Sequence, residues 1–222
     1  MTTSLAPSPA RRRAPSKRAL ATRKRVLDAA EAVFAAKGFD GATIREIAVE
    51  AGEPVGTIHH HGGGKEQLFR KTVARRAAIL SEHRVAALNE ARNDGPLTVG
   101  AVLTAFFQPF LELAQLDPGW RNYARLVAFV SSDTQWRSLA SDCFDPTFDI
   151  FLQALIDLQP GASRQQLAAR FVFCVSALIA HLTSQDRIGR IGGGHLPRKE
   201  ALQNLISFCA LGMAPSGPVC PS

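Results

Sequence analysis

Side chains that can hydrogen-bond to nucleic acid gather between residues 43 and 65 of this 222-residue chain. Hydroxyl, imidazole and ammonium groups of this kind contact phosphate oxygens or the edges of bases. Their types and order therefore indicate recognition of a duplex. The candidate DNA-contacting residues are Thr43, Arg45, Val55, Gly56, Thr57, His59, His60 and Lys65.

Two patterns in the same stretch suggest a phosphate-binding loop and a metal site, but the residue spacing matches neither. The run Gly62–Lys65 resembles a phosphate-binding loop, yet a Walker motif needs Gly at position 59 and Ser or Thr at position 66. The histidines 59–61 are consecutive, and consecutive side chains on a helix point about 100° apart, so one metal ion cannot gather all three. No HExxH helix, paired cysteines or GxSxG elbow is present in the sequence. We predict a protein that is not an enzyme and that binds no metal or cofactor.

Two short helices separated by a turn are predicted to position the candidate side chains. Thr43 and Glu46 have the spacing of a reciprocal N-terminal capping box, and Gly52 can supply the positive φ of a helix stop. Pro54 suits the first turn of a second helix, where its missing N–H costs nothing. A short helical hairpin buried in a core would show the same apolar pattern, but the polar outer side of the second helix favours DNA binding.

The second helix is expected to pack through Val55 and Ile58 and to present Thr57, His59 and His60 outward. Longer helices flank the pair, one over residues 22–37 that ends at a glycine and one from Lys65 to about residue 89. The segments 29–52, 55–58 and 63–69, within residues 22 to 75, resemble the N-terminal domain of the TetR family of bacterial transcriptional regulators.

The resemblance implies a homodimer whose recognition helices enter successive major grooves of a palindromic operator, and a helical C-terminal domain that binds a small molecule and releases the DNA. It places Thr43 and Lys65 against phosphates and Gly56 and Thr57 in the groove. At His59 the family usually has a tyrosine that touches the backbone.

Two further departures affect the packing of the small domain. At Gly62 the family usually has a phenylalanine that fills the core, and where this chain has Glu53 it usually has an apolar residue. Losing a buried aromatic side chain costs about 3 to 5 kcal/mol if nothing fills the gap. The alternative function is therefore a dimeric helical ligand-binding or interaction module with weak or lost DNA binding.

Positive charge concentrates at the N-terminus. Eight basic residues precede the first acidic residue, Asp28, while the net charge of the whole chain is +7. Residues 1–21 combine five of these basic residues with three prolines and little apolar surface, so we predict a disordered basic arm that either follows DNA phosphates or only aids solubility. An arginine-rich start also occurs in transit peptides, but the next helix already belongs to the folded motif. No run of 18 uninterrupted apolar residues occurs, so no membrane segment and a cytoplasmic location are expected.

Every long segment after residue 96 has helical rather than alternating periodicity. Helices are expected over residues 97–115, from Pro118 to about residue 130, from Pro146 to about residue 159, from Ser163 to about residue 184, and over residues 197–211. The predicted fold is all-α: a helix-turn-helix domain (22–64), a connecting helix (65–93), an effector-binding and dimerisation domain (97–212) and a flexible tail (213–222).

The last two helices are the candidate dimer interface, because the first of them is apolar nearly all round and needs cover on two sides. Burial of both helices within a monomer is the alternative. Cys174 and Cys209 lie in these apolar runs and are interpreted as small core residues rather than redox groups. The candidate interface residues are Phe171, Val175, Leu178, Leu182, Leu202, Leu205, Ile206 and Cys209.

Aromatic residues cluster in the middle helices, with a few polar residues among them. A mostly apolar lining with few polar groups is typical of a small-molecule site, although aromatic side chains at helical spacing more often form core. The candidate effector-pocket residues are Phe107, Gln108, Phe110, Trp120, Tyr123, Phe148 and His181. We expect a ligand-responsive DNA-binding transcriptional repressor that is released from its operator by a small hydrophobic or amphipathic effector.

Overall fold

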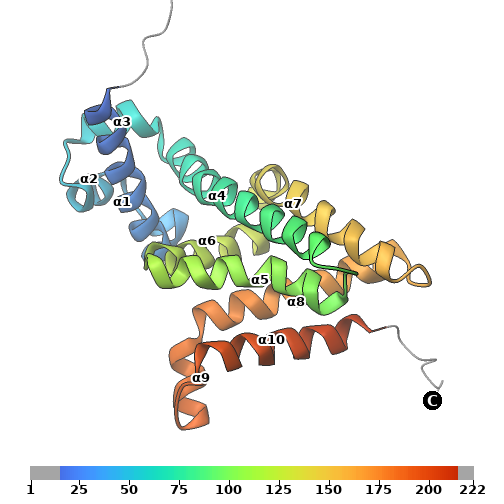
Figure 1. Cartoon of the computed structure of the whole chain (residues 1–222). Coiled ribbons are helices and arrows are strands. Elements are labelled where there is room, and N and C mark those ends of the chain that lie inside the picture. Colours follow the sequence, from blue (N-terminus) through green and yellow to red (C-terminus); the bar gives the residue numbers. More distant parts are fainter. Residues whose placement is uncertain (1–15, 215–222) are drawn as a thin grey trace, which may run out of the picture.

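The computed structural model describes residues 16–214, and the regular structure in this range is entirely helical. Figure 1 shows a head built from the first three helices, a long fourth helix that leaves the head, and a larger body. The elements are α1 Lys17–Gly41, α2 Ile44–Ala51, α3 Val55–Gly62, α4 Lys65–Asn93, α5 Val99–Leu116, α6 Gly119–Ser132, the 3-10 turn η1 Thr134–Trp136, α7 Arg137–Leu158, α8 Arg164–Thr183, α9 Gln185–Gly192 and α10 Arg198–Met213. The predicted all-α architecture, with a helix-turn-helix head and a larger helical domain, is confirmed.

The local signals around α2 act as the sequence predicts. The Thr43 hydroxyl accepts a hydrogen bond from the Glu46 N–H (3.2 Å), and the Glu46 carboxylate accepts one from the Thr43 N–H (2.9 Å). Gly52 ends α2 in the left-handed region, with φ 62° and ψ 33°. Because these bonds satisfy the free backbone groups at both ends of a helix of only eight residues, α2 is well defined despite its length.

The first helix is longer than predicted. It begins at Lys17, with the Ser16 hydroxyl accepting a hydrogen bond from the Ala19 N–H, so the prediction of a disordered arm is wrong for residues 17–21. These residues are good helix formers behind a serine cap, and this local preference outweighs their charge. Gly38 leaves helical geometry (φ 71°, ψ 177°) as predicted, but a further turn continues to Gly41. Residues 1–15 and most of the predicted tail lie outside the described residues.

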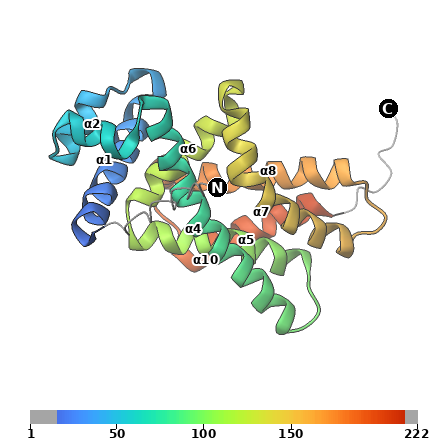
Figure 2. The same cartoon turned by 90° about the horizontal axis from the view of Figure 1, so that it is seen from above.

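The body is a bundle in which α4 and α5 pack side by side and α8 pairs with α10 (Figures 1 and 2). The predicted start at Pro146 is wrong, because Pro146 lies inside the continuous helix α7. Proline removes one helical hydrogen bond, but Leu139 before it and Phe151 and Leu155 after it are buried, and this packing holds both halves in line. Helix α9 was not predicted; its two glycines, 189 and 192, weaken any helical signal over so short a segment.

Two helices, α5 and α8, are long and apolar enough to cross a membrane by length and composition alone. Both pack within the body: α5 contacts α4, α6, α7 and α10, and α8 contacts α6, α7 and α10. Core helices of globular bundles have this composition, so the two segments are weak indicators of a membrane span.

Candidate DNA-binding surface and effector cavity

Helix α3 presents one side to solvent and buries the other. Ile58 is fully buried, whereas Gly56, His59 and His60 are exposed, as predicted for a recognition helix. Val55 is 40% exposed, so its predicted inward orientation is wrong. It is the first residue of α3, where no preceding turn of the helix covers it. The outer side of α3 therefore combines imidazole groups with a small apolar group at its start. Two other predicted DNA contacts lie nearby: Arg45 is exposed on α2, and Thr57 is part-buried on α3.

The C-terminal end of α3 is fixed by side-chain contacts. The Nδ1 atom of His59 lies 3.2 Å from the carbonyl oxygen of Gly63, so a proton on Nδ1 donates to that carbonyl and leaves Nε2 free to face outward. The Lys71 ammonium, from α4, donates to the carbonyl oxygens of His61 (3.2 Å) and Gly62 (3.0 Å). A cation at this point satisfies the free carbonyls of the last turn and complements the helix dipole.

The two residues expected to meet phosphate lie at helix starts. Thr43 is exposed at the start of α2, and its hydroxyl is engaged in the capping box with Glu46. Lys65 opens α4, and its ammonium donates to the Asp40 carbonyl (3.1 Å) and lies 4.6 Å from the centre of the Phe39 ring. These contacts hold the positive charge of Lys65 beside the end of α1 rather than leaving it mobile.

Local contacts accommodate the two departures from the family pattern. Glu53, in the turn, forms an ion pair with Arg25 of α1, so the polar residue links the turn to the first helix. Gly62 is buried, and a Cβ placed there would lie 3.0 Å from Cδ1 of Leu68. Leu68 therefore packs directly over the glycine and occupies space that a larger residue at position 62 would need.

Two sets of side chains join the head to the body. We call the first the charged joint: Asp28 and Glu31 of α1, Arg75 and Arg76 of α4, and Asp117 in the turn between α5 and α6. The Arg76 guanidinium binds both oxygens of Glu31 (2.8 and 2.7 Å) and lies 2.8 Å from Asp117 Oδ2. Arg75 bridges Asp28 (2.6 Å) and Glu31 (3.2 Å).

Charge pairing outweighs burial in the charged joint. Burial alone would lower the pKa of Arg76, but the carboxylates of Glu31 and Asp117 raise it above its ordinary value. Burial would raise the pKa of Asp117, but the Gly119 N–H and the Arg76 guanidinium hold it below its ordinary value. Both effects favour the ionised pair, so the joint is charged at neutral pH.

We call the second set the aromatic joint: Phe34 and Phe39 of α1, Phe69 of α4 and Trp136 of η1. The Trp136 ring centre lies 4.7 Å from that of Phe39 and 4.5 Å from that of Phe69, and Phe34 meets Phe69 edge-on at 5.0 Å. Trp136 is fully buried, and its Nε1 has no hydrogen-bond partner among the described residues. A residue of the body thus completes the core of the head.

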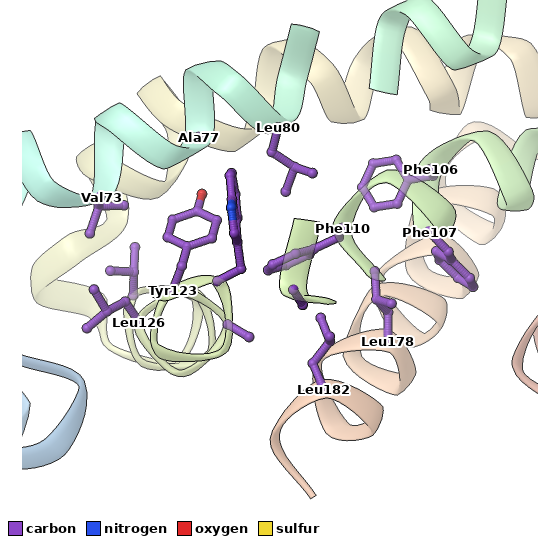
Figure 3. Close-up of a cluster of buried hydrophobic side chains, with 14 of the residues drawn as sticks. Val73, Ala77, Leu80, Phe106, Phe107, Phe110, Tyr123, Leu126, Leu178 and Leu182 are labelled. Carbon is purple, nitrogen blue, oxygen red and sulfur yellow. The ribbon is translucent and has the colours of Figure 1, made fainter. Parts of the chain in front are cut away.

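Most of the residues predicted to line an effector pocket are core. Phe107, Phe110, Trp120 and Tyr123 are each at most 3% exposed, and Figure 3 shows three of them packed between α4, α5, α6 and α8. Phe148 packs on the ring of a neighbouring phenylalanine, and Gln108 hydrogen-bonds to Glu112 near the surface. Aromatic side chains repeated at helical spacing on three packed helices meet one another, and so they fill the core.

A cavity of about 810 Å³ lies elsewhere in the body, between the end of α5, the start of α6 and helices α8, α9 and α10. Of the predicted pocket residues, His181 lines it. Burial lowers the pKa of His181, so its imidazole is neutral at neutral pH. Apart from His181, the lining was not predicted, because the wall includes α9 and the loop that follows it, which carry no clear helical periodicity.

The predicted dimer residues divide into two groups. Four of them, Phe171, Leu178, Leu182 and Cys209, are at most 4% exposed and pack inside the protomer, so they cannot form an interface. The other four, Val175, Leu202, Leu205 and Ile206, are part-buried. Large apolar side chains exposed on the same two helices are Val172, Phe173, Phe208 and Leu211. Both helices carry exposed apolar side chains, but periodicity alone did not show which side of each is covered.

A helix-turn-helix head on a larger helical body is the architecture of a DNA-binding regulator, and comparison with known proteins identifies the family. Residues 26–72 match the family described as "Bacterial regulatory proteins, tetR family", and residues 104–212 match "Tetracyclin repressor-like, C-terminal domain". The chain belongs to the TetR family of transcriptional regulators.

Similar proteins agree with this assignment. The chain is 39% identical over 66 residues to the HTH-type transcriptional repressor AcnR of Corynebacterium glutamicum, an alignment that covers 28% of this chain and 35% of the repressor. The chain thus matches about a third of the length of that relative. A structure from Shewanella sp. PV-4 assigned to the tetR family has a TM-score of 0.67 at 17% identity, over 88% of this chain and 99% of the other. A TetR-like transcriptional regulator from Rhodococcus sp. RHA1 has a TM-score of 0.61 at 20% identity, over 92% and 100%.

Proposed function

We propose that this protein is a homodimeric, ligand-responsive repressor in the cytoplasm that leaves a palindromic operator when a small effector binds its body. The observation that carries the proposal is the outer side of α3, where exposed imidazoles and a small apolar group lie on a helix whose C-terminal end is held by His59 and Lys71. A rigid helix with polar groups on one side can enter a major groove and hydrogen-bond to base edges.

The groups around α3 suit different parts of a duplex. His59 Nε2 and the His60 ring face solvent and can reach base edges or phosphates. The starts of α2 and α4 carry Thr43 and Lys65, and the positive end of a helix dipole favours a phosphate there. In this arrangement α3 would supply sequence preference, and the flanking helix starts would supply affinity that falls with salt.

Dimerisation would use the exposed apolar sides of α8 and α10. Phe173 is 70% exposed on α8 and Leu211 is 79% exposed on α10, and these helices pack against each other in the body. A second copy that covers both would form a four-helix bundle and remove this apolar surface from water. Two heads on one dimer would then contact two half-sites of an operator.

The alternative function, a dimeric module with weak or lost DNA binding, is favoured by Glu53. Its carboxylate lies in the turn that approaches the duplex and would repel phosphate, although its ion pair with Arg25 offsets part of that charge. This alternative predicts a stable dimer that retains the upstream duplex weakly or not at all.

A mobility-shift titration at two salt concentrations tests the proposal, with DNA from upstream of the protein's own gene and a scrambled duplex as competitor. We expect sequence-specific retention, and a loss of about 1 to 3 kcal/mol of binding free energy in His60→Ala. The matched control is His83→Ala, an exposed histidine on α4 far along the chain from the head.

Size measurement of the same samples separates the outcomes. A dimer that retains the upstream duplex no better than the scrambled one supports the alternative function. Equal losses in His60→Ala and His83→Ala would show that α3 does not read the bases. Phe173→Glu is expected to give a monomer and to lose operator binding with it, because one head alone contacts one half-site.

A further inference from the structure

The cavity in the body is built from five helices and has a volume suited to a small ligand. Its volume of about 810 Å³ falls within the range of about 300 to 1,000 Å³ that is typical of such sites. Leu111 of α5, Leu182 of α8 and Leu205 of α10 contribute apolar surface to its lining. In Figure 1, α9 lies beside the end of α8 and the start of α10, and Arg187, Ile188 and Ile191 of α9 line the cavity.

The wall at α9 depends on a close contact with a glycine. Gly189 is buried, and a Cβ added there would lie 2.4 Å from Cε1 of His195. The His195 ring therefore lies directly on the backbone of α9, and both His195 and the neighbouring Ile188 line the cavity. This contact ties the loop between α9 and α10 to the helix before it.

The charged residues of the lining are all basic. Arg121 comes from α6, Arg187 from α9 and Arg198 from the start of α10, and no aspartate or glutamate is among the described residues that line the cavity. The Arg198 guanidinium donates to the neutral side chain of Gln115 (2.6 Å), and none of the three arginines is in an ion pair with another described residue. Three exposed arginines from different helices thus line one cavity, without a carboxylate partner among the described residues.

We propose that this cavity binds an amphipathic anion, with an apolar chain against the leucines and a carboxylate or phosphate head between Arg121, Arg187 and Arg198. Guanidinium groups bind both kinds of head through paired, charge-assisted hydrogen bonds. His181 and His195 add further ring N–H groups at the same cavity. The inference names the chemical class of the effector, and it rests on the proposed function for its biological role.

The position of the cavity gives it a route to the head. Gln115 and Arg121 line the cavity on either side of the turn between α5 and α6, and Asp117 of that turn holds Arg76 in the charged joint. A ligand head bound by Arg121 therefore acts on the segment that positions Asp117. Such a ligand would lower DNA affinity only if it binds the DNA-free protein more tightly than the DNA-bound protein.

Isothermal titration of the full chain, without DNA, tests the class of ligand. The probes are decanoate, decyl phosphate and decanol, which share one apolar chain and differ in the head, all below their micellar concentrations. We expect at least one of the two anions to bind about ten-fold or more tightly than the alcohol, since charge-assisted hydrogen bonds carry this much free energy. The relative affinity of the two anions then identifies the head.

Matched variants place the binding in the cavity. Arg121→Gln and Arg187→Gln should each reduce the preference for the anion about ten-fold, whereas Arg125→Gln on α6 and Arg190→Gln on α9, whose arginines lie outside the lining, should not. Equal binding of alcohol and anions, no binding of any probe, or equal effects of cavity and control variants would overturn the proposal. A mobility-shift assay with the same probes measures DNA binding separately, so the ligand proposal and the proposed function can fail independently.

Discussion

The two joints between head and body hold the same helices by opposite physical means. The charged joint orients α1 and α4 through hydrogen bonds of Arg76 that need a defined geometry. The aromatic joint packs rings of the same two helices around Trp136, and such contacts tolerate small changes of angle. A buried ion pair is either formed or broken, whereas apolar packing can adjust.

This difference assigns a separate role to each joint. The aromatic joint places a body residue, Trp136, among apolar rings of the head and so helps to keep the head attached. The charged joint holds head and body at a defined angle, because Arg76 contacts Glu31 of α1 and Asp117 of the turn between α5 and α6 at the same time. A switch acting on the head is expected to work through the charged joint.

The largest effect is expected at the aromatic joint. Trp136→Ala should lower the free energy of unfolding by about 3 to 5 kcal/mol, because it leaves a cavity among the rings of α1 and α4. Chemical denaturation followed by circular dichroism measures this loss. Trp136→Phe should cost clearly less, since it keeps a ring and removes the buried Nε1 that has no partner among the described residues. A loss below about 1 kcal/mol in the alanine variant would show that packing at Trp136 does not hold the joint.

A somewhat smaller effect is expected when the charged joint is broken. Arg76→Met leaves Glu31 buried, with Arg75 as its remaining partner at 3.2 Å, and should cost about 3 kcal/mol. Adding Glu31→Leu should recover most of that loss, because the uncompensated carboxylate is then gone. The same denaturation experiment on the two single variants and the double variant gives the coupling energy. If the losses of unfolding free energy in the two single variants add up to the loss in the double variant, Arg76 and Glu31 are not coupled, and their ion pair does not stabilise the joint.

Arg84 is the matched control on the same helix, α4. Its guanidinium lies 3.6 Å from the centre of the Phe106 ring and donates to the Phe106 carbonyl oxygen (2.8 Å). Burial lowers the pKa of Arg84 to about 9, so it remains charged at neutral pH without a carboxylate partner among the described residues. Arg84→Met leaves no buried charge behind, and we expect a change within about 1 kcal/mol.

The smallest effect is a pH dependence of the charged joint. The pKa of Asp117 is held below its ordinary value, so its stabilising contribution is complete above the unfolded pKa of about 4 and is lost as the pH falls through the folded pKa. Asp117→Asn keeps an acceptor for the Gly119 N–H but removes the charge. The difference in Tm between the native protein and this variant should shrink between about pH 6 and pH 3.

The size of that difference is limited by solvent. The Asp117 side chain is 51% exposed, which restricts the contribution at neutral pH to about 1 kcal/mol or less. Asp28, whose pKa is also lowered, titrates in both proteins and cancels in the comparison. If the difference in Tm between the two proteins stays constant or grows as the pH falls, the charge of Asp117 does not stabilise the joint.

The sequence predicted the head well because its signals are local. A capping box spans four residues, and the positive φ at Gly52 follows from the residue type, so neither depends on the rest of the fold. Both joints are different, because Trp136 meets Phe39 and Asp117 meets Arg76 across long stretches of chain. No periodicity in one segment shows which distant segment covers it.

The cavity was missed for a related physical reason. Apolar helical spacing identifies side chains that leave water, but not whether they then meet another side chain or line an open space. Phe107 and Tyr123 met other side chains, and His181 lines the cavity. The three arginines that line the cavity gave no sign of a binding site in the sequence, because they come close to one cavity only when α6, α9 and α10 pack together.

The contacts of Lys71 determine what an effector can change. Because its ammonium, on α4, holds the last carbonyls of α3, the recognition helix and the start of α4 form one rigid unit. Under the proposed function, an effector would alter the spacing between two such units and leave the surface of each intact. A single half-site would then be bound equally with and without effector, and only the paired arrangement of half-sites would lose affinity.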